Sequence, residues 1–331
     1  MTPANSFDET AVSWPVDGID VEATLTRPPG DGPFPAVIMV AGSGPTDRNW
    51  NTPLLPGTNG SAALLARALT GIGFVTLRYD KIASGPHARE NVAQMMGRIS
   101  LQSHLDELAG GVELLAGRED VNSDRVFILG NSEGCLHAVN YQAHTPDSPA
   151  AGLVLTAPPG RPAGALARSQ IAAQLAPVPG GEQLMATYDA AMADFLAGRP
   201  VQADPDLPEG LRNLIMSVTD PANQPFAREL WGTDPLVWLA EVVEPVLVVI
   251  GKKDIQVDWQ TDGPLFEALA GRHPNIAIVY PEDANHVLKH EPRNRSQVTP
   301  ADAAMTYNAD GLILNAEALQ AITGWLSRVS A

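Results

Sequence analysis

The chain contains six short, mostly apolar segments. They lie at residues 35–41, 74–80, 125–131, 151–158, 245–251 and 276–282. Runs of this kind, unlike alternating ones, are typical of strands that are covered on both faces. We therefore predict six strands of a sheet that is covered on both faces.

The segments between most of these strands have apolar residues at helical spacing. They lie at residues 61–73, 103–117, 133–144 and 262–271, and a further one, residues 315–329, closes the chain. Strands that alternate with helices form a mostly parallel sheet with helices on both faces. The amino-terminal part differs, because two alternating segments flank Asp17 and Gly18 and predict a β-hairpin.

One connection is far longer than the usual loop of about 2 to 6 residues. Residues 159–244 contain no strand-like run but several helical segments separated by proline and glycine. We predict that this stretch is a helical cap, or lid, inserted into an α/β core formed by residues 1–158 and 245–331. The large apolar residues of the cap are Met185, Met192, Met216, Trp231 and Trp238. They either line a substrate pocket or pack the cap's own core, and their helical spacing favours the second interpretation.

Length and composition support this organisation and narrow the function. A chain of 331 residues with 44% hydrophobic residues can bury one large core, so two unrelated domains are the weaker interpretation. The net charge of −17, with scattered basic residues, argues against binding to nucleic acids or anionic membranes. No stretch approaches the roughly 18 apolar residues of a membrane helix, and the amino end lacks a secretory pattern. We expect a soluble, cytoplasmic protein.

The single cysteine, Cys135, cannot form an internal disulfide, and no Cys/His pattern has the spacing of zinc ligands. We therefore expect no metal site. The sequence leaves the oligomeric state open, a homodimer included.

Residues 125–140 combine a predicted strand, a glycine-flanked serine and a predicted helix. The turn reads Gly130-Asn131-Ser132-Glu133-Gly134. Glycines on both sides permit a tight turn that lifts the serine side chain clear of its neighbours. The pattern alone is a modest signal, but its place between strand and helix predicts a nucleophile elbow with Ser132 as the nucleophile. A glycine-rich turn with a capping serine is the alternative.

A nucleophilic serine needs a base, and the base needs a group that orients it. Asp254 follows the strand at 245–251, and His286 follows the strand at 276–282. Since the carboxyl ends of parallel strands meet at one edge of a sheet, Asp254 and His286 are candidates for the acid and the base. The alternative interpretation is that Asp254 only caps a turn and that His286 is an ordinary histidine in a loop.

An oxyanion hole is predicted from two backbone amides. The strand at 35–41 ends in the glycine-rich loop "GSGPTDRNWN", in which Ser43 is the candidate donor through its main-chain N–H. The amide of Glu133 is the second candidate, because it begins the helix after Ser132.

These motifs together resemble the α/β-hydrolase superfamily, in particular its bacterial esterases and serine aminopeptidase-like members. They are "AGSGPTDR" at 41–48, "LRYDK" at 77–81, "GNSEG" at 130–134, "GKKD" at 251–254 and "NHVLK" at 285–289. The resemblance implies a serine hydrolase that needs no cofactor and most often acts on carboxylic esters. Two segments depart from the family pattern, "IASGPHAREN" at 82–91 and Asn131, where a histidine is common.

The sequence thus predicts a cap-bearing α/β-hydrolase that cleaves a small-molecule ester through an acyl-serine. Ser132, Asp254 and His286 form its predicted triad, and Ser43 and Glu133 supply its oxyanion hole. A thioesterase, a peptidase or a carbon–carbon bond hydrolase would use the same triad. A catalytically silent receptor for small molecules is the alternative outside the enzymes, and the complete triad argues against it.

Overall fold

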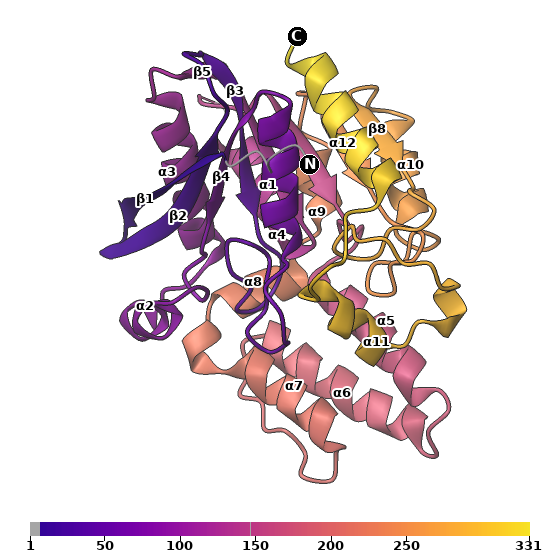
Figure 1. Ribbon diagram of the computed structural model, residues 1–331. Helices are drawn as coiled ribbons and strands as arrows, with labels where there is room; N and C mark the ends of the chain where they lie inside the picture. Colours follow the sequence, from indigo (N-terminus) through magenta and orange to yellow (C-terminus); the bar gives the residue numbers. More distant parts are fainter. Residues whose placement is uncertain (1–6, 146) are drawn as a thin grey trace.

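An eight-stranded sheet forms the centre of the protein in the computed structural model (Figure 1), which describes residues 7–145 and 147–331. The strands are β1 (Asp8–Val16), β2 (Ile19–Arg27), β3 (Phe34–Val40), β4 (Val75–Tyr79), β5 (Val121–Asn131), β6 (Gly152–Thr156), β7 (Val246–Val249) and β8 (Ile276–Val279). Their order in the sheet is β1-β2-β4-β3-β5-β6-β7-β8. Strands β3 to β8 are parallel, whereas β1 and β2 are antiparallel to their neighbours. The mostly parallel sheet predicted from the sequence is confirmed.

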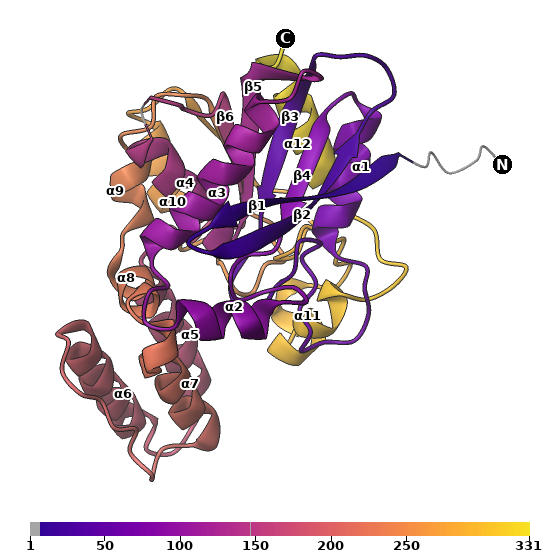
Figure 2. The ribbon, with the colours of Figure 1, turned by 90° about the vertical axis from the view of Figure 1, so that its left-hand side faces the viewer.

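Helices cover both faces of this sheet, as Figure 2 shows from the side. The helices that pack on the core are α1 (Ser61–Gly71), α3 (Leu101–Ala116), α4 (Glu133–His144), α10 (Gly263–Ala270) and α12 (Ala316–Val329). Helices α1 and α12 share one apolar cluster with the sheet, and α3, α4 and α10 share the other.

Strand β3 illustrates why the core strands are mostly apolar. Val37 and Met39 belong to the cluster on the α1 side, whereas Ile38 and Val40 belong to the cluster on the opposite side. Successive side chains of a strand point to opposite faces, so a strand that is covered on both faces consists mostly of apolar residues. The uninterrupted runs in the sequence follow from this burial.

The predicted hairpin joins β1 and β2 through a two-residue turn. Val16 pairs with Ile19, and the intervening Asp17 and Gly18 have φ angles of 49° and 87°. Positive φ at both positions is what a tight turn between right-twisted strands requires, and aspartate followed by glycine is one of the pairs that tolerate it well.

Residues 159–244, between β6 and β7, fold into helices with an apolar cluster of their own. The helices are α5 (Ala163–Leu175), α6 (Gly181–Leu196), α7 (Glu209–Thr219), α8 (Phe226–Gly232) and α9 (Pro235–Leu239), with a short 3₁₀ turn, η1 (Pro221–Asn223). In both ribbon views α6 and α7 project beyond one end of the sheet (Figures 1 and 2).

The five large apolar residues singled out in this stretch have different surroundings. Met192 is buried in the cluster, and Met185 and Trp231 pack against it. Met216 is exposed, and Trp238 packs on the core of the sheet. Packing within the helical stretch, rather than a pocket lining, thus accounts for three of them.

Two α-helices had no counterpart in the sequence pattern: α2 (Ala88–Met95) and α11 (Pro300–Tyr307). A short 3₁₀ turn, η2 (Arg295–Gln297), precedes α11. Each of the two helices has a single buried residue, Met95 in α2 and Ala303 in α11. A helix that buries so little has no apolar stripe by which its sequence could reveal it.

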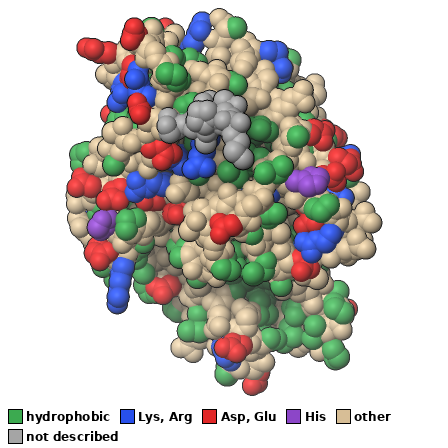
Figure 3. Space-filling view, in the orientation of Figure 1, with side chains coloured by type: hydrophobic (Ala, Val, Ile, Leu, Met, Phe, Trp, Pro, Cys, Tyr) green, Lys and Arg blue, Asp and Glu red, His purple; other side chains and the backbone are tan. Residues whose placement is uncertain are grey.

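On the face drawn in Figure 3, basic side chains lie among acidic ones. Within the described part of the chain, no helix is both long enough and apolar enough to span a bilayer.

The core around Phe127 provides a test of the packing. This fully buried ring lies between Phe74 and Trp325, with centroid distances of 6.3 Å to each. Replacing Phe127 with alanine should lower the free energy of unfolding by about 3–5 kcal/mol, because the cavity cannot close between two large rings. Denaturant unfolding followed by circular dichroism measures this loss. The control Met305→Ala, at a side chain that is 53% exposed, should stay within about 0.5 kcal/mol of wild type, and equal losses in the two variants would contradict the assigned packing.

Candidate active site

Ser132 lies on a sharp turn between β5 and α4, as the sequence pattern anticipates. Its φ of 53° and ψ of −120° are unfavourable for a residue with a side chain. A Cβ on Gly130 would lie 2.5 Å from the carbonyl oxygen of Gly134, and a Cβ on Gly134 would collide with the carbonyl of Val40. The two glycines therefore permit the close approach of strand and helix that holds Ser132 in this conformation.

Asp254 and His286 are brought into direct contact. His286 Nδ1 lies 2.8 Å from Asp254 Oδ2, and the two side chains are 7% and 0% exposed. The other carboxylate oxygen of Asp254 accepts hydrogen bonds from the backbone N–H groups of Gln256 (2.7 Å) and Val257 (3.0 Å). The ring of Tyr307, from α11, stacks on the imidazole with 6.1 Å between centroids. The carboxylate and the imidazole are thus each held on more than one side.

Two other carboxylates follow the same strand but have other partners. Asp262 forms a bidentate pair with Arg161, with distances of 3.0 Å for both hydrogen bonds. Asp258 lies 3.3 Å from Arg295. Of the three carboxylates, Asp254 is the one that reaches His286.

Asn131 departs from the family pattern and links two parts of the site. Its Nδ2 donates to the backbone carbonyl of His286 at 3.2 Å and to the side chain of Thr156 at 3.2 Å. The residue before Ser132 thereby ties the turn to the loop that carries the histidine.

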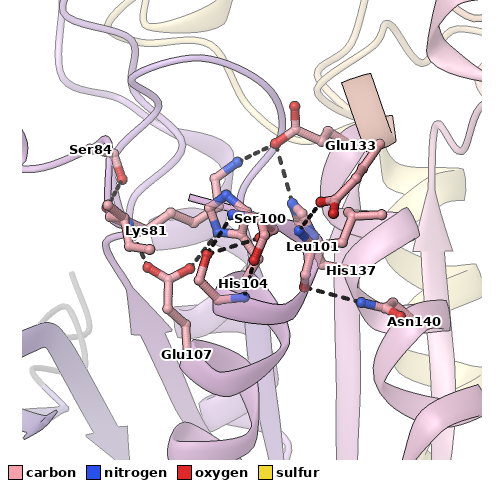
Figure 4. A network of polar contacts seen from close by, with 12 residues as sticks. Lys81, Ser84, Ser100, Leu101, His104, Glu107, Glu133, His137 and Asn140 are labelled. Carbon is pink, nitrogen blue, oxygen red and sulfur yellow. Dashed lines mark hydrogen bonds and ion pairs between the residues drawn. The ribbon is translucent and has the colours of Figure 1, made fainter. Parts of the chain in front are cut away.

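Lys81, the last residue of "LRYDK", lies buried between the two segments predicted to form the oxyanion hole. Its Nζ donates to the carbonyl oxygen of Gly42 at 2.8 Å and lies 2.6 Å from Glu133 Oε1. Figure 4 shows the ion pair with Glu133 and its continuation to His137. The sequence analysis quoted this motif without assigning Lys81 a role. A lysine directly after a predicted strand at the same sheet edge was the available signal.

The ion pair continues into a buried polar network. His137 Nε2 lies 3.3 Å from Glu133 Oε1 (Figure 4). The centroids of the His137 and His104 rings are 4.7 Å apart, and His104 Nδ1 forms a hydrogen bond with the carboxyl group of Glu107. Burial opposes the charge on Glu133, but Lys81 and His137 hold the pKa of that carboxyl well below its usual range. Burial lowers the pKa of His137 to about 4. Near neutral pH, Glu133 is therefore ionised and His137 is neutral.

Two pockets meet at Ser132. The apolar pocket is lined by Ser43, Ser132, Glu133 and mostly aliphatic or aromatic side chains, among them Leu136, Leu155, Leu230, Leu239 and Phe266. The polar pocket is lined by Ser43, Ser132 and His286 together with Thr46, Trp50, Thr52, Gln256 and Tyr307. Ser132 and His286 thus open onto the same space.

Cys135 also lines the apolar pocket, but its chemistry is suppressed. The side chain is 2% exposed, and burial raises the pKa of its thiol, which stays protonated near neutral pH. Within residues 7–145 and 147–331, no group of three or more histidine, cysteine, aspartate or glutamate residues is arranged to hold a metal ion.

Comparison with known proteins extends these observations. The chain is 26% identical over 291 residues to the esterase EstD of Thermotoga maritima, a match that covers 86% of this chain and 60% of the length of EstD. The fold is similar to that of an esterase from Pyrococcus furiosus, with a TM-score of 0.57, 18% identity and coverage of 100% of this chain and 95% of the other. It is also similar to the proline iminopeptidase of Mycobacterium smegmatis, with a TM-score of 0.54, 15% identity and coverage of 97% and 99%.

A family model described as the alpha/beta hydrolase family matches residues 37–296, which include the turn at Ser132, the contact between Asp254 and His286, and the helical stretch between β6 and β7. The chain therefore belongs to the alpha/beta hydrolase family.

Proposed function

We propose that the protein is a serine hydrolase that cleaves carboxylic esters through an acyl-serine intermediate. The observation that carries this proposal is His286, whose Nδ1 is held by Asp254 while its ring and Ser132 line the same pocket. This arrangement leaves Nε2 of the imidazole free to take a proton from the serine hydroxyl. The similarity to an esterase over most of this chain supports the choice of an ester substrate.

In the proposed reaction, Ser132 Oγ attacks the ester carbonyl carbon as His286 Nε2 takes its proton. Asp254 orients the imidazole and stabilises the imidazolium that forms. The tetrahedral intermediate collapses as His286 returns the proton to the departing alcohol, which leaves an acyl-serine. A water molecule then repeats the sequence with His286 as base and releases the acid.

The oxyanion of the tetrahedral intermediate is held by the amides of Ser43 and Glu133. The Gly42–Ser43 peptide is trans, so its carbonyl and its N–H point in opposite directions. Lys81 binds the Gly42 carbonyl and thereby turns the Ser43 N–H away from itself. The same ammonium group holds the side chain of Glu133. Lys81 is thus a positioning residue for both donors.

Residues 159–244 act as a cap in this proposal. Helices α8 and α9 contribute Leu230 and Leu239 to the apolar pocket, and α5 contributes Ala163 and Leu166. These side chains, rather than the methionines and tryptophans of the stretch, would contact the substrate.

A thioesterase, a peptidase and a carbon–carbon bond hydrolase remain the alternatives on the same triad.

The first test is covalent labelling of Ser132. A fluorophosphonate should attach one phosphonyl group to Ser132 of the wild type, because a nucleophilic serine attacks the phosphorus and displaces fluoride. Intact-protein and peptide mass spectrometry measure the adduct, and Ser132→Ala is the control. A folded wild type without the adduct, or an adduct that persists in Ser132→Ala, would refute the proposed nucleophile.

The second test concerns the acid. Asp254→Asn should lower kcat by several orders of magnitude, because the amide selects the wrong imidazole tautomer, as in the serine-protease triad, where the equivalent change costs about 10⁴. Asp258→Asn is the matched control and should stay within about tenfold of wild type. Steady-state kinetics on one ester decide between them. An active Asp254→Asn beside an inactive Asp258→Asn would assign the acid to Asp258.

The third test concerns Lys81. Lys81→Met should lower kcat about a hundredfold with little change in KM. Misaligned oxyanion donors weaken the stabilisation of the transition state far more than the binding of the substrate. The affinity for a boronic acid, which mimics the tetrahedral intermediate, should fall in parallel. Lys252→Met, at a surface ion pair with Glu282, is the control.

Lys81→Met leaves the buried carboxylate of Glu133 without its cation and can therefore destabilise the fold. The double variant Lys81→Met/Glu133→Gln removes this unpaired charge, so an effect of Lys81 on the oxyanion donors can be measured apart from an effect on folding. A double variant that folds and still binds the boronic acid as tightly as wild type would show that Lys81 has no positioning role.

A further inference from the structure

We propose that the apolar pocket binds the acyl group of the ester and that the polar pocket binds its alcohol, which carries a further hydroxyl or ether oxygen. The substrate class is therefore esters in which the acyl chain is uncharged and apolar and the alcohol is small and carries a second oxygen. This assignment rests on the proposed acyl-serine mechanism.

The position of the base separates the two pockets. The two substituents of the reacting carbonyl carbon, the acyl chain and the alkoxy group, lie on different sides of Ser132. The departing alkoxide must receive its proton from His286, so it has to lie within reach of the imidazole. Among the described residues, those around the polar pocket include His286, whereas those around the apolar pocket do not. The alcohol consequently occupies the polar pocket, and the acyl chain takes the other.

The lining of the apolar pocket selects an uncharged acyl chain. Two charged side chains line it, Glu133 and Arg161. Glu133 is paired with Lys81 at 2.6 Å, and Arg161 is held by both oxygens of the buried Asp262. Neither is available to pair with a charged acyl group, and burial of an unpaired charge among aliphatic side chains is costly. An acid with a second carboxylate would therefore bind poorly.

The polar pocket offers groups that can hydrogen-bond an alcohol. Thr46, Thr52, Gln256 and Tyr307 bring hydroxyl or amide groups to it. Trp50 lines the same pocket, is 3% exposed, and has a φ of 63°, which is strained for a bulky residue. Its indole Nε1 is buried without a hydrogen-bond partner in the described residues.

A buried N–H without an acceptor costs free energy, and strained residues often mark functional sites. A second oxygen on the alcohol would supply the missing acceptor for Trp50. An open groove with Asp47, Arg48 and Asn49 on its wall shares Thr52 with the polar pocket, so hydrophilic surface lies beside the site proposed for the alcohol.

The experiment compares kcat/KM for matched esters in a pH-stat assay. The panel contains 2,3-dihydroxypropyl octanoate, butyl octanoate, 2,3-dihydroxypropyl butanoate and the 2,3-dihydroxypropyl monoester of succinic acid. Wild type should prefer the dihydroxypropyl over the butyl ester of octanoic acid about fivefold or more, the size of one neutral hydrogen bond. It should discriminate against the succinate ester more strongly.

Two variants test the two sides separately. Trp50→Phe keeps an aromatic ring but removes the N–H, so it should abolish most of the dihydroxypropyl preference and leave the ratio of octanoate to butanoate unchanged. Ala163→Phe fills the apolar pocket at the start of α5, so it should lower that acyl ratio about tenfold or more and leave the alcohol preference unchanged. Each ratio is measured within one variant, so the folded fraction of the sample cancels.

The reverse pattern, with Trp50→Phe changing the acyl preference and Ala163→Phe the alcohol preference, would overturn the assignment. So would unchanged ratios in both variants or efficient hydrolysis of the succinate ester. Hydrolysis of no ester in the panel, together with a wild type that resists the fluorophosphonate, would instead overturn the proposed function and the assignment with it.

Discussion

The turn after β5 lies so close to the start of α4 at Gly130, and to the end of β3 at Gly134, that side chains are excluded at both positions, and the arrangement of the site depends on this approach. It forces Ser132 into a positive φ and starts α4 directly behind it. The strain is local and is opposed by the packing of the whole sheet, since α4 lies on β5, β6 and β3. On this turn Ser132 lines both pockets.

In the proposed function, the ion pair buried beside this turn orients the site rather than stabilising the fold. Taking Lys81 and Glu133 out of water is costly, and an ion pair of this kind seldom stabilises a fold more than apolar residues of equal size would. What it supplies is direction, because one ammonium group contacts the loop after β3 and the first residue of α4. The neutral His137 completes the coordination of Glu133 without adding a second positive charge.

The site is assembled from segments with different degrees of independence. Asp254 and Ser132 follow strands of the sheet, so the sheet itself sets their spacing. His286 lies on a longer loop, which is held by Asn131 from one side and by Tyr307 of α11 from the other. Part of the wall of the apolar pocket comes from α5, α8 and α9. Helices α5 and α8 contribute to a core of their own, whereas α9 packs on the core of the sheet. The proposed substrate range can therefore change with α5 and α8 while the reactive groups stay in place.

The strands, the hairpin, the turn at Ser132 and the candidates Asp254 and His286 could all be predicted from the sequence, because each depends on a local pattern together with the rule that parallel strands end at one edge. The contacts of Lys81, the stacking of Tyr307 and the difference between the two pockets could not. They join residues that lie far apart, such as the 39 and 52 positions between Lys81 and its two partners, and no periodicity encodes them. The same holds for the methionines and tryptophans of residues 159–244. Their spacing reports that they lie on helices, whereas only the packing of those helices decides which side chains face the pocket.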